Sequence, residues 1–215
     1  MNRCIQIVQM TNPLRLWVLS LFLGSVVAAA EPKTILFYGD SLTAGYGLED
    51  PAGLSFPGLI QARINEAGLS YRVVNAGLSG ETTAGGLRRI DWILRQPVDI
   101  FVLELGGNDG LRGLPVATSR SNLQAIIDRV RGKYPSVKIL LAGMQMPTSM
   151  GPDYTAAFAD MYPELARTNG ISLIPFLLEG VGGVPSLNLG DQIHPNGEGH
   201  QRVAETVWRH LEPLL

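Results

Sequence analysis

The sequence predicts one α/β domain in which a five-stranded parallel sheet lies between two layers of helices. Five short apolar runs alternate along the chain with segments whose apolar residues recur at helical spacing. Each run is almost continuously apolar over four to six residues, which is typical of strands that are buried on both faces. Five strand–helix units in succession therefore favour a three-layer α/β/α sandwich.

The element boundaries follow from local signals. We expect strands at residues 34–38, 71–74, 100–105, 137–142 and 171–176, and helices at residues 57–67, 82–95, 118–133, 153–168 and 197–211. Pro57 stands near a first helical turn, and Gly68 and Asn169-Gly170 follow helix ends. With 215 residues, 46% of them hydrophobic and 17% charged, the chain fits one soluble domain.

The first thirty residues differ from the rest. Arg3 and Arg15 are their only charged residues, and residues 16–30 form an uncharged, mostly apolar run that ends in three alanines. This pattern predicts a secretory signal peptide over residues 1–30, with a periplasmic or secreted domain over residues 31–215. A membrane anchor is the alternative, but the run is shorter than the roughly 20 residues that a spanning helix needs. Met1 and Met10 are both candidate start residues.

Charge and cysteine content exclude several classes of protein. The net charge is −2, and because residues 1–30 carry two arginines and no acid, the remainder carries −4. Such a chain is unsuited to nucleic acid, and we interpret the Arg88-Arg89 pair as a solvated helix face. Cys4 is the only cysteine, so the predicted domain has no disulfide, zinc thiolate or cysteine nucleophile. We expect a monomer.

Polar residues that follow strands are the candidate site residues, because sites in parallel sheets lie beyond the carboxyl ends of the strands. Ser41 follows the first strand at a turn into a helix, where it could be a nucleophile or an N-cap. The glycine-rich segment 75–82 follows the second strand and could either present backbone N–H groups or cap a helix. Asn108, after the third strand, could donate to an oxyanion or simply stabilise a turn.

His194 is the histidine best placed to act as a base. It lies on a loop before the last helix, with Asp191 three residues earlier, and a base oriented by an acid is the logic of a catalytic triad. A loop histidine with an incidental acid is the alternative. His200 and His210 fall within the last helix, where we expect solvated or partly packed roles.

Four segments together resemble the signature blocks of the GDSL, or SGNH, hydrolase superfamily. They occur in the family's order and span nearly the whole predicted domain: 39–42 (GDSL), 75–80, 106–109 (GGND) and 191–194 (DQIH). Residues 35–46 and 103–111 are most similar to the bacterial periplasmic thioesterase/lysophospholipase and arylesterase branch. The resemblance implies a flavodoxin-like sheet and a serine esterase or thioesterase that works through an acyl-enzyme without a cofactor or metal.

The resemblance also implies a role for each matching residue. Ser41 would be the nucleophile, His194 the general base and Asp191 its orienting acid. The oxyanion would be bound by the backbone N–H groups of Ser41 and Gly80 and by the side chain of Asn108. Gly77 is an alternative donor to Gly80.

Three acids near these blocks are expected to be structural. We interpret Asp40 as shaping the turn, Glu104 as hydrogen-bonded or neutral within its apolar strand, and Asp109 as fixing the Asn108 loop. Asp191, His194 and His200 do not form a convincing metal set.

The expected substrate is a lysophospholipid, an acyl thioester or an aryl ester. Residues 144–151 and 178–189 are expected to line its acyl side, since they combine apolar residues with glycines. The alternatives are a carbohydrate O-deacetylase of the same fold, a non-catalytic flavodoxin-like binding module and a redox flavoprotein.

Overall fold

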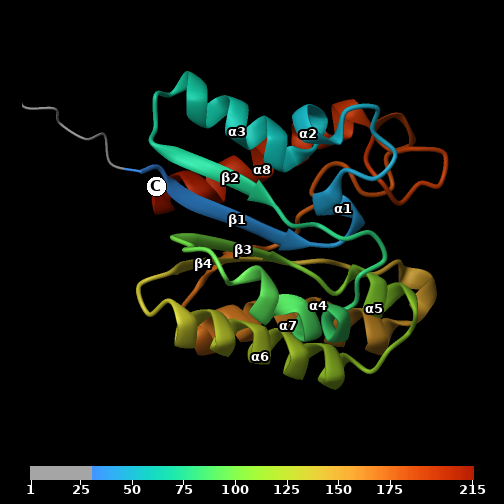
Figure 1. Ribbon diagram of the computed structural model, residues 1–215. Coiled ribbons are helices and arrows are strands. Elements are labelled where there is room, and N and C mark those ends of the chain that lie inside the picture. Colours follow the sequence, from blue (N-terminus) through green and yellow to red (C-terminus); the bar gives the residue numbers. More distant parts are fainter. Residues whose placement is uncertain (1–30) are drawn as a thin grey trace, which may run out of the picture. The chain divides into compact units, whose positions relative to one another are not determined.

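The computed structural model describes residues 31–215, and the predicted signal peptide lies outside the described residues. Within this range the expected five-stranded parallel sheet is present (Figure 1). Its strands are β1 (Lys33–Gly39), β2 (Tyr71–Asn75), β3 (Ile100–Glu104), β4 (Lys138–Ala142) and β5 (Ser172–Ile174). Their order is β2-β1-β3-β4-β5, the flavodoxin-like order, so the predicted fold class is confirmed.

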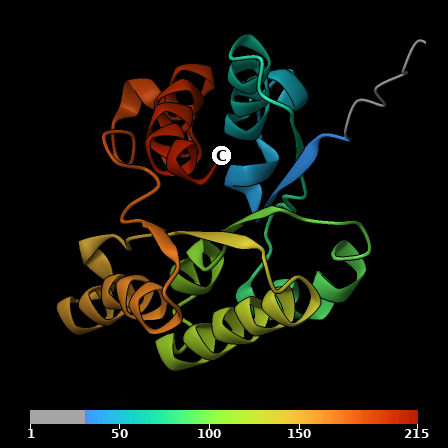
Figure 2. The same cartoon turned by 90° about the vertical axis from the view of Figure 1, so that its left-hand side faces the viewer.

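Helices cover both faces of this sheet, as Figure 2 shows from the side. On one face α3 (Phe56–Glu66) packs beside α8 (Gly197–Leu211), and the other face is covered by α4 (Thr83–Ile93), α6 (Val116–Lys133) and α7 (Pro152–Asn169). Strands β1 and β3 are buried almost throughout, which accounts for their continuous apolarity. Three of the 3₁₀ turns lie at Thr148–Met150, Pro185–Leu187 and Glu212–Leu214.

Three short helices were not among the helix ranges expected from the sequence: α1 (Ser41–Ala44), α2 (Pro51–Leu54) and α5 (Gly107–Leu111). Of these, only α1 was anticipated, as the helix that begins after the Ser41 turn. Each of the three has four or five residues, too few to show a helical period. Two of them, α1 and α5, directly follow the carboxyl ends of β1 and β3. The fifth strand is also shorter than expected, Ser172–Ile174 in place of residues 171–176.

The strand order creates a crevice between β1 and β3. The chain leaves β1 towards β2 on one side and returns to β3 on the other, so the connections after these two strands diverge. Crevices of this kind are where ligands bind in open parallel sheets. Ser41 and Asn108 follow the two strands that flank it.

One expectation about the surface is half wrong. Arg88 is exposed, but the guanidinium of Arg89 lies over the Tyr38 ring at 4.4 Å and its Nε donates to Glu81 at 2.8 Å. Arg89 also donates to the carbonyl of Ala76 at 2.8 Å. Its role is to hold the loop after β2 against α4, because the buried Glu81 supplies a charge that draws it inward.

Candidate active site

The turn after β1 places Ser41 at the crevice. Asp40 caps the short helix α1, its Oδ1 accepting the Leu42 N–H at 3.0 Å. The N-cap is therefore Asp40, and the interpretation of Ser41 as a cap is wrong. Gly39 permits this turn, since a Cβ there would stand 2.4 Å from Oε2 of Glu104 and 2.1 Å from Oγ1 of Thr43.

The loop before α8 brings His194 to Ser41. His194 Nε2 lies 2.9 Å from Ser41 Oγ, although the two residues are 153 positions apart. The loop is closed by the Leu189 N–H, which donates to the His194 carbonyl at 2.7 Å. Gln192 at its tip has a φ of 59°, a left-handed conformation that is uncommon for a residue other than glycine.

Asp191 orients the His194 ring. Its Oδ2 lies 2.6 Å from His194 Nδ1, and its Oδ1 accepts the N–H groups of Ile193 at 2.9 Å and His194 at 3.0 Å. The backbone N–H and then the side chain of His194 lower the pKa of Asp191 to about 2. An ionised carboxylate only accepts, so it favours the ring tautomer with a proton on Nδ1, in which Nε2 can accept from the Ser41 hydroxyl.

Asp40 and Glu104 form a buried acid pair behind Ser41. Oε2 of Glu104 accepts the Asp40 N–H at 3.1 Å and the Thr43 hydroxyl at 2.7 Å, while Oε1 has no partner among the described residues. Burial raises the pKa of Glu104 well above its ordinary value, and the nearby Asp40 raises it further. Burial also raises the pKa of Asp40, to about 6. Glu104 is therefore a hydrogen-bonded, buried acid whose protonated form is favoured by its surroundings, in line with the expectation from the sequence.

Asn108 is held by Asp40. Its Nδ2 donates to Oδ2 of Asp40 at 3.0 Å, which fixes the orientation of the amide at the start of α5. Asp109 is buried and accepts from the Thr83 N–H at 2.8 Å and from the Ser119 hydroxyl at 3.1 Å. Asp109 thus ties the loop to α4 and α6, as expected from the sequence.

The two candidate glycines differ in what their N–H groups do. The Gly77 N–H donates to the side chain of Asn75 at 3.0 Å, whereas the N–H groups of Gly80 and Ser41 make no hydrogen bond within residues 31–215. Gly80 has a φ of 80°, a conformation that favours glycine. The segment lies against the Ser41 turn, because the Leu78 N–H donates to the Gly39 carbonyl at 3.0 Å. This geometry favours Gly80 over Gly77 as a free donor.

A cavity of about 610 Å³ opens beside Ser41, Asn108 and His194. The two segments expected at the acyl side both contribute to it, and its other walls come from the Ser41 turn, Phe176, α5 and the His194 loop. The apolar lining residues are Leu42, Leu111, Met144, Met146, Pro147, Phe176, Leu178 and Ile193. Gly80 is not among the lining residues. The cavity therefore offers apolar walls with a hydroxyl, an imidazole and an amide at one end.

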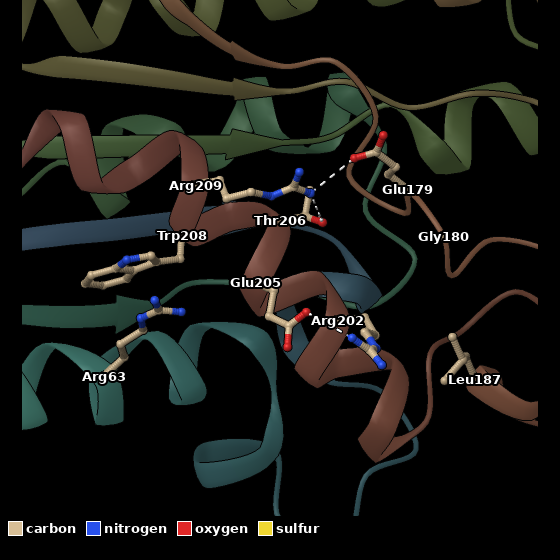
Figure 3. A pocket seen from close by; sticks show the side chains of 9 residues that line it. All are labelled: Arg63, Glu179, Gly180, Leu187, Arg202, Glu205, Thr206, Trp208 and Arg209. Carbon is tan, nitrogen blue, oxygen red and sulfur yellow. Dashed lines mark hydrogen bonds and ion pairs between the residues drawn. The ribbon is translucent and has the colours of Figure 1, made fainter.

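A second hollow, of about 820 Å³, lies between α3, α8 and residues 179–187 (Figure 3). Its arginines already have partners: Arg209 lies 3.2 Å from Glu179, and Arg202 lies 3.3 Å from Glu205. Arg63 lies over the Trp208 ring at 4.5 Å. None of the nine residues that line this hollow is an activated nucleophile, so it does not compete with the cavity at Ser41.

The remaining histidines lie away from the cavity. His200 is buried and its Nδ1 accepts the Phe56 N–H at 3.2 Å, so the expectation of a solvated or partly packed residue is wrong. Burial lowers the pKa of His200 to about 4, which keeps it neutral. His210 contacts the Thr206 carbonyl at 2.9 Å. Within residues 31–215 there is no group of three acids or histidines arranged to hold a metal, and no helix has the length and apolarity to cross a membrane.

Comparison with known proteins identifies the family. The model of the GDSL-like Lipase/Acylhydrolase family matches residues 37–202, which include every residue of the site described above. The chain therefore belongs to the GDSL-like lipase/acylhydrolase family, and it is an acyl ester hydrolase.

Individual members of this family are similar to the chain over most of its length. The chain is 42% identical to esterase TesA of Pseudomonas aeruginosa over 198 residues, which are 92% of this chain and 96% of that protein. It is 35% identical to an arylesterase of Vibrio mimicus (92% and 98% of the two chains) and 36% identical to thioesterase 1/protease 1/lysophospholipase L1 of Escherichia coli (87% of each). The crystal structure of TesA covers 85% of this chain and 100% of its own, with a TM-score of 0.80.

Proposed function

We propose that Ser41, His194 and Asp191 form the catalytic triad of this hydrolase. The observation that carries the proposal is the continuous chain of contacts from Ser41 Oγ through the imidazole to the Asp191 carboxylate, at 2.9 and 2.6 Å. His194 Nε2 accepts the hydroxyl proton while Oγ attacks the acyl carbonyl, and Asp191 stabilises the imidazolium that forms. The same ring then protonates the leaving alcohol or thiol.

The tetrahedral oxyanion is proposed to rest on three donors. The backbone N–H groups of Ser41 and Gly80 are free in the described residues, and the Asn108 amide retains one N–H after its bond to Asp40. Donors of this kind, held in place before the reaction, contribute about 100- to 1,000-fold in rate each. Water attacks the resulting acyl-enzyme with His194 again as base, so the cycle needs no cofactor.

We propose that the acyl group is a medium or long hydrocarbon chain carried by a lysophospholipid, a thioester or an aryl ester. Two methionines and three leucines are among the residues that line the cavity, and such side chains suit a flexible apolar chain. The names of the relatives, which include an arylesterase and a thioesterase/lysophospholipase, support the same classes. A carbohydrate O-deacetylase would need polar walls for a sugar.

We also propose that residues 1–30 are removed as a signal peptide and that the enzyme acts in the periplasm or outside the cell. The basic start, apolar run and alanine exit support this. Amino-terminal sequencing of the exported protein should begin at Glu31, and a protein that retains residues 1–30 would contradict the proposal.

Replacing Ser41 by alanine tests the triad. The Ser41→Ala variant should lose hydrolysis of p-nitrophenyl butyrate by about a million-fold, the loss typical of removing a serine nucleophile. A fluorophosphonate probe should label the wild type and not the variant. An undiminished rate would exclude Ser41 as nucleophile.

A series of p-nitrophenyl esters with acyl chains of increasing length tests the proposed substrate. A rate that falls sharply for acyl chains longer than acetate would favour the carbohydrate O-deacetylase.

A further inference from the structure

Four exposed apolar side chains border the mouth of the cavity. We call Tyr46, Leu78, Leu111 and Ile193 the apolar rim, and their exposed fractions lie between 45% and 53%. They come from four separate segments of the chain: the end of the α1 turn, the loop after β2, helix α5 and the His194 loop. Their gathering at one place is therefore a product of the fold and not of one amphipathic helix.

Contacts in the structure place each rim residue in the cavity wall, against His194, or beside the Ser41 turn. Leu111 and Ile193 line the cavity itself. The Tyr46 ring packs on the His194 ring with centroids 4.7 Å apart. Leu78 stands beside the Ser41 turn, since its N–H donates to the Gly39 carbonyl at 3.0 Å.

The other large exposed apolar residues of the described range do not gather in this way. They are Leu54 on α2, Leu69 ahead of β2 and Trp92 on α4. Isolated residues of this kind are ordinary on protein surfaces, whereas a group around a cavity marks an interaction site. Leu69 precedes the amino end of β2, whereas the cavity lies beyond the carboxyl ends of the strands, at the opposite end of the sheet.

Two features indicate which kind of surface covers the apolar rim: the rim is continuous with the apolar cavity, and the charge of the domain disfavours some partners. The apolar surface of the rim runs into the apolar walls of the cavity, as it would if hydrocarbon passed over one into the other. Residues 31–215 carry a net charge of −4, which disfavours an anionic surface. Arg112 follows Leu111, and its guanidinium donates to the Gly80 carbonyl at 3.1 Å, so a cation stands at the rim where a phosphate would approach.

We propose that the apolar rim docks on the surface of aggregated zwitterionic lipid, a micelle or bilayer, from which single acyl chains enter the cavity. This inference rests on the proposed acyl substrate. Docking removes the four rim side chains from water and places the polar head beside Arg112, with the ester at Ser41. A dissolved short-chain ester reaches Ser41 without touching most of the rim.

The test compares Leu78→Asp with Leu69→Asp. Leu69 is the matched control because it is also an exposed leucine but lies at the amino ends of the strands, away from the cavity. Three properties are measured: sedimentation with phosphatidylcholine vesicles, hydrolysis of lysophosphatidylcholine above its micelle-forming concentration, and hydrolysis of dissolved p-nitrophenyl butyrate. Leu78→Asp should lower vesicle binding and micellar hydrolysis about tenfold, because an apolar side chain is lost and a charge must approach lipid. It should leave butyrate hydrolysis unchanged, and Leu69→Asp should alter none of the three.

Butyrate hydrolysis also reports that each variant is folded, and Leu78→Asn repeats the test without a new charge. The docking proposal is overturned if wild-type protein does not bind the vesicles, if both leucine variants lose binding equally, or if Leu78→Asp loses butyrate and micellar activity together. Failure of the proposed function looks different, since the wild type would then hydrolyse neither ester.

Discussion

Two aspartates of the site, Asp40 and Asp191, have opposite environments. Both accept backbone N–H groups within a tight turn, Asp40 from Leu42 and Asp191 from Ile193 and His194. Asp40 is buried beside another acid, and burial raises its pKa to about 6. The Asp191 side chain is 38% exposed, and the N–H and ring of His194 lower its pKa to about 2. Because its pKa is about 2, Asp191 is the aspartate that stays ionised at neutral pH, and the difference from Asp40 comes from burial and hydrogen bonding.

The largest expected effect of breaking this contrast comes from Asp191→Asn. An amide beside His194 Nδ1 can donate to it, which favours the ring tautomer that cannot accept from Ser41. We expect kcat on p-nitrophenyl butyrate to fall about 10,000-fold, the loss typical of a triad whose tautomer is wrong. A loss of less than about tenfold would show that Asp191 does not orient the base.

Asp40→Asn should have a smaller effect, because Asp40 contacts the proposed oxyanion donor Asn108 and is not itself a member of the proposed triad. An asparagine has one oxygen for two donors, the Leu42 N–H and the Asn108 amide, so one of them faces an NH₂ group. We expect kcat to fall by up to about 100-fold, less than the loss of a complete oxyanion donor. KM should change little.

A double-mutant cycle with Asn108→Ala tests this route. If Asp40 acts only by holding Asn108, the double variant should be no slower than Asn108→Ala alone, because neighbouring effects of this kind are not additive. Fully additive losses would assign Asp40 a separate role in the reaction.

Glu104→Gln should have the smallest effect on activity. A glutamine amide resembles the protonated form of Glu104: its oxygen accepts from the Asp40 N–H and the Thr43 hydroxyl, and its NH₂ can face Asp40. Glu104→Leu removes the acceptor and leaves two buried donors unpaired, the Asp40 N–H and the Thr43 hydroxyl. It should lower kcat about tenfold and should lower the free energy of unfolding by about 1–3 kcal/mol per donor. Equal losses in the two variants would show that shape alone matters at this position.

The pH dependence of stability separates Glu104 further from Asp191. The folded pKa of Glu104 is raised, so the folded state binds the proton more tightly and wild-type stability falls as pH rises above about 4.5, the ordinary value. Glu104→Gln lacks this proton and should be relatively more stable than the wild type as pH increases, measured by urea unfolding. Asp191 has the opposite sign: its contribution is present above its ordinary pKa near 3.8 and is lost as pH falls through about 2.

Sequence patterns predicted the main elements well because those elements are long or continuously apolar. Strands β1 and β3 were recognised from runs that are buried on both faces, and α8 from its spaced apolar residues. Helix α5 and the extent of α1 were not predicted, since four or five residues show no helical period. His200 and Arg89 were misjudged because a helical sequence does not reveal which face an adjacent loop or ring will cover.

By itself the sequence determined the sheet, the family and the residues that follow each strand, because these depend on local periodicity and on short motifs. Only the tertiary structure decided that Ser41 and His194 lie 2.9 Å apart, that Asp40 caps the helix and that burial raises the pKa of Glu104. Distances and proton affinities depend on groups that are remote along the chain. The same strand order that opens a crevice between β1 and β3 brings those groups together.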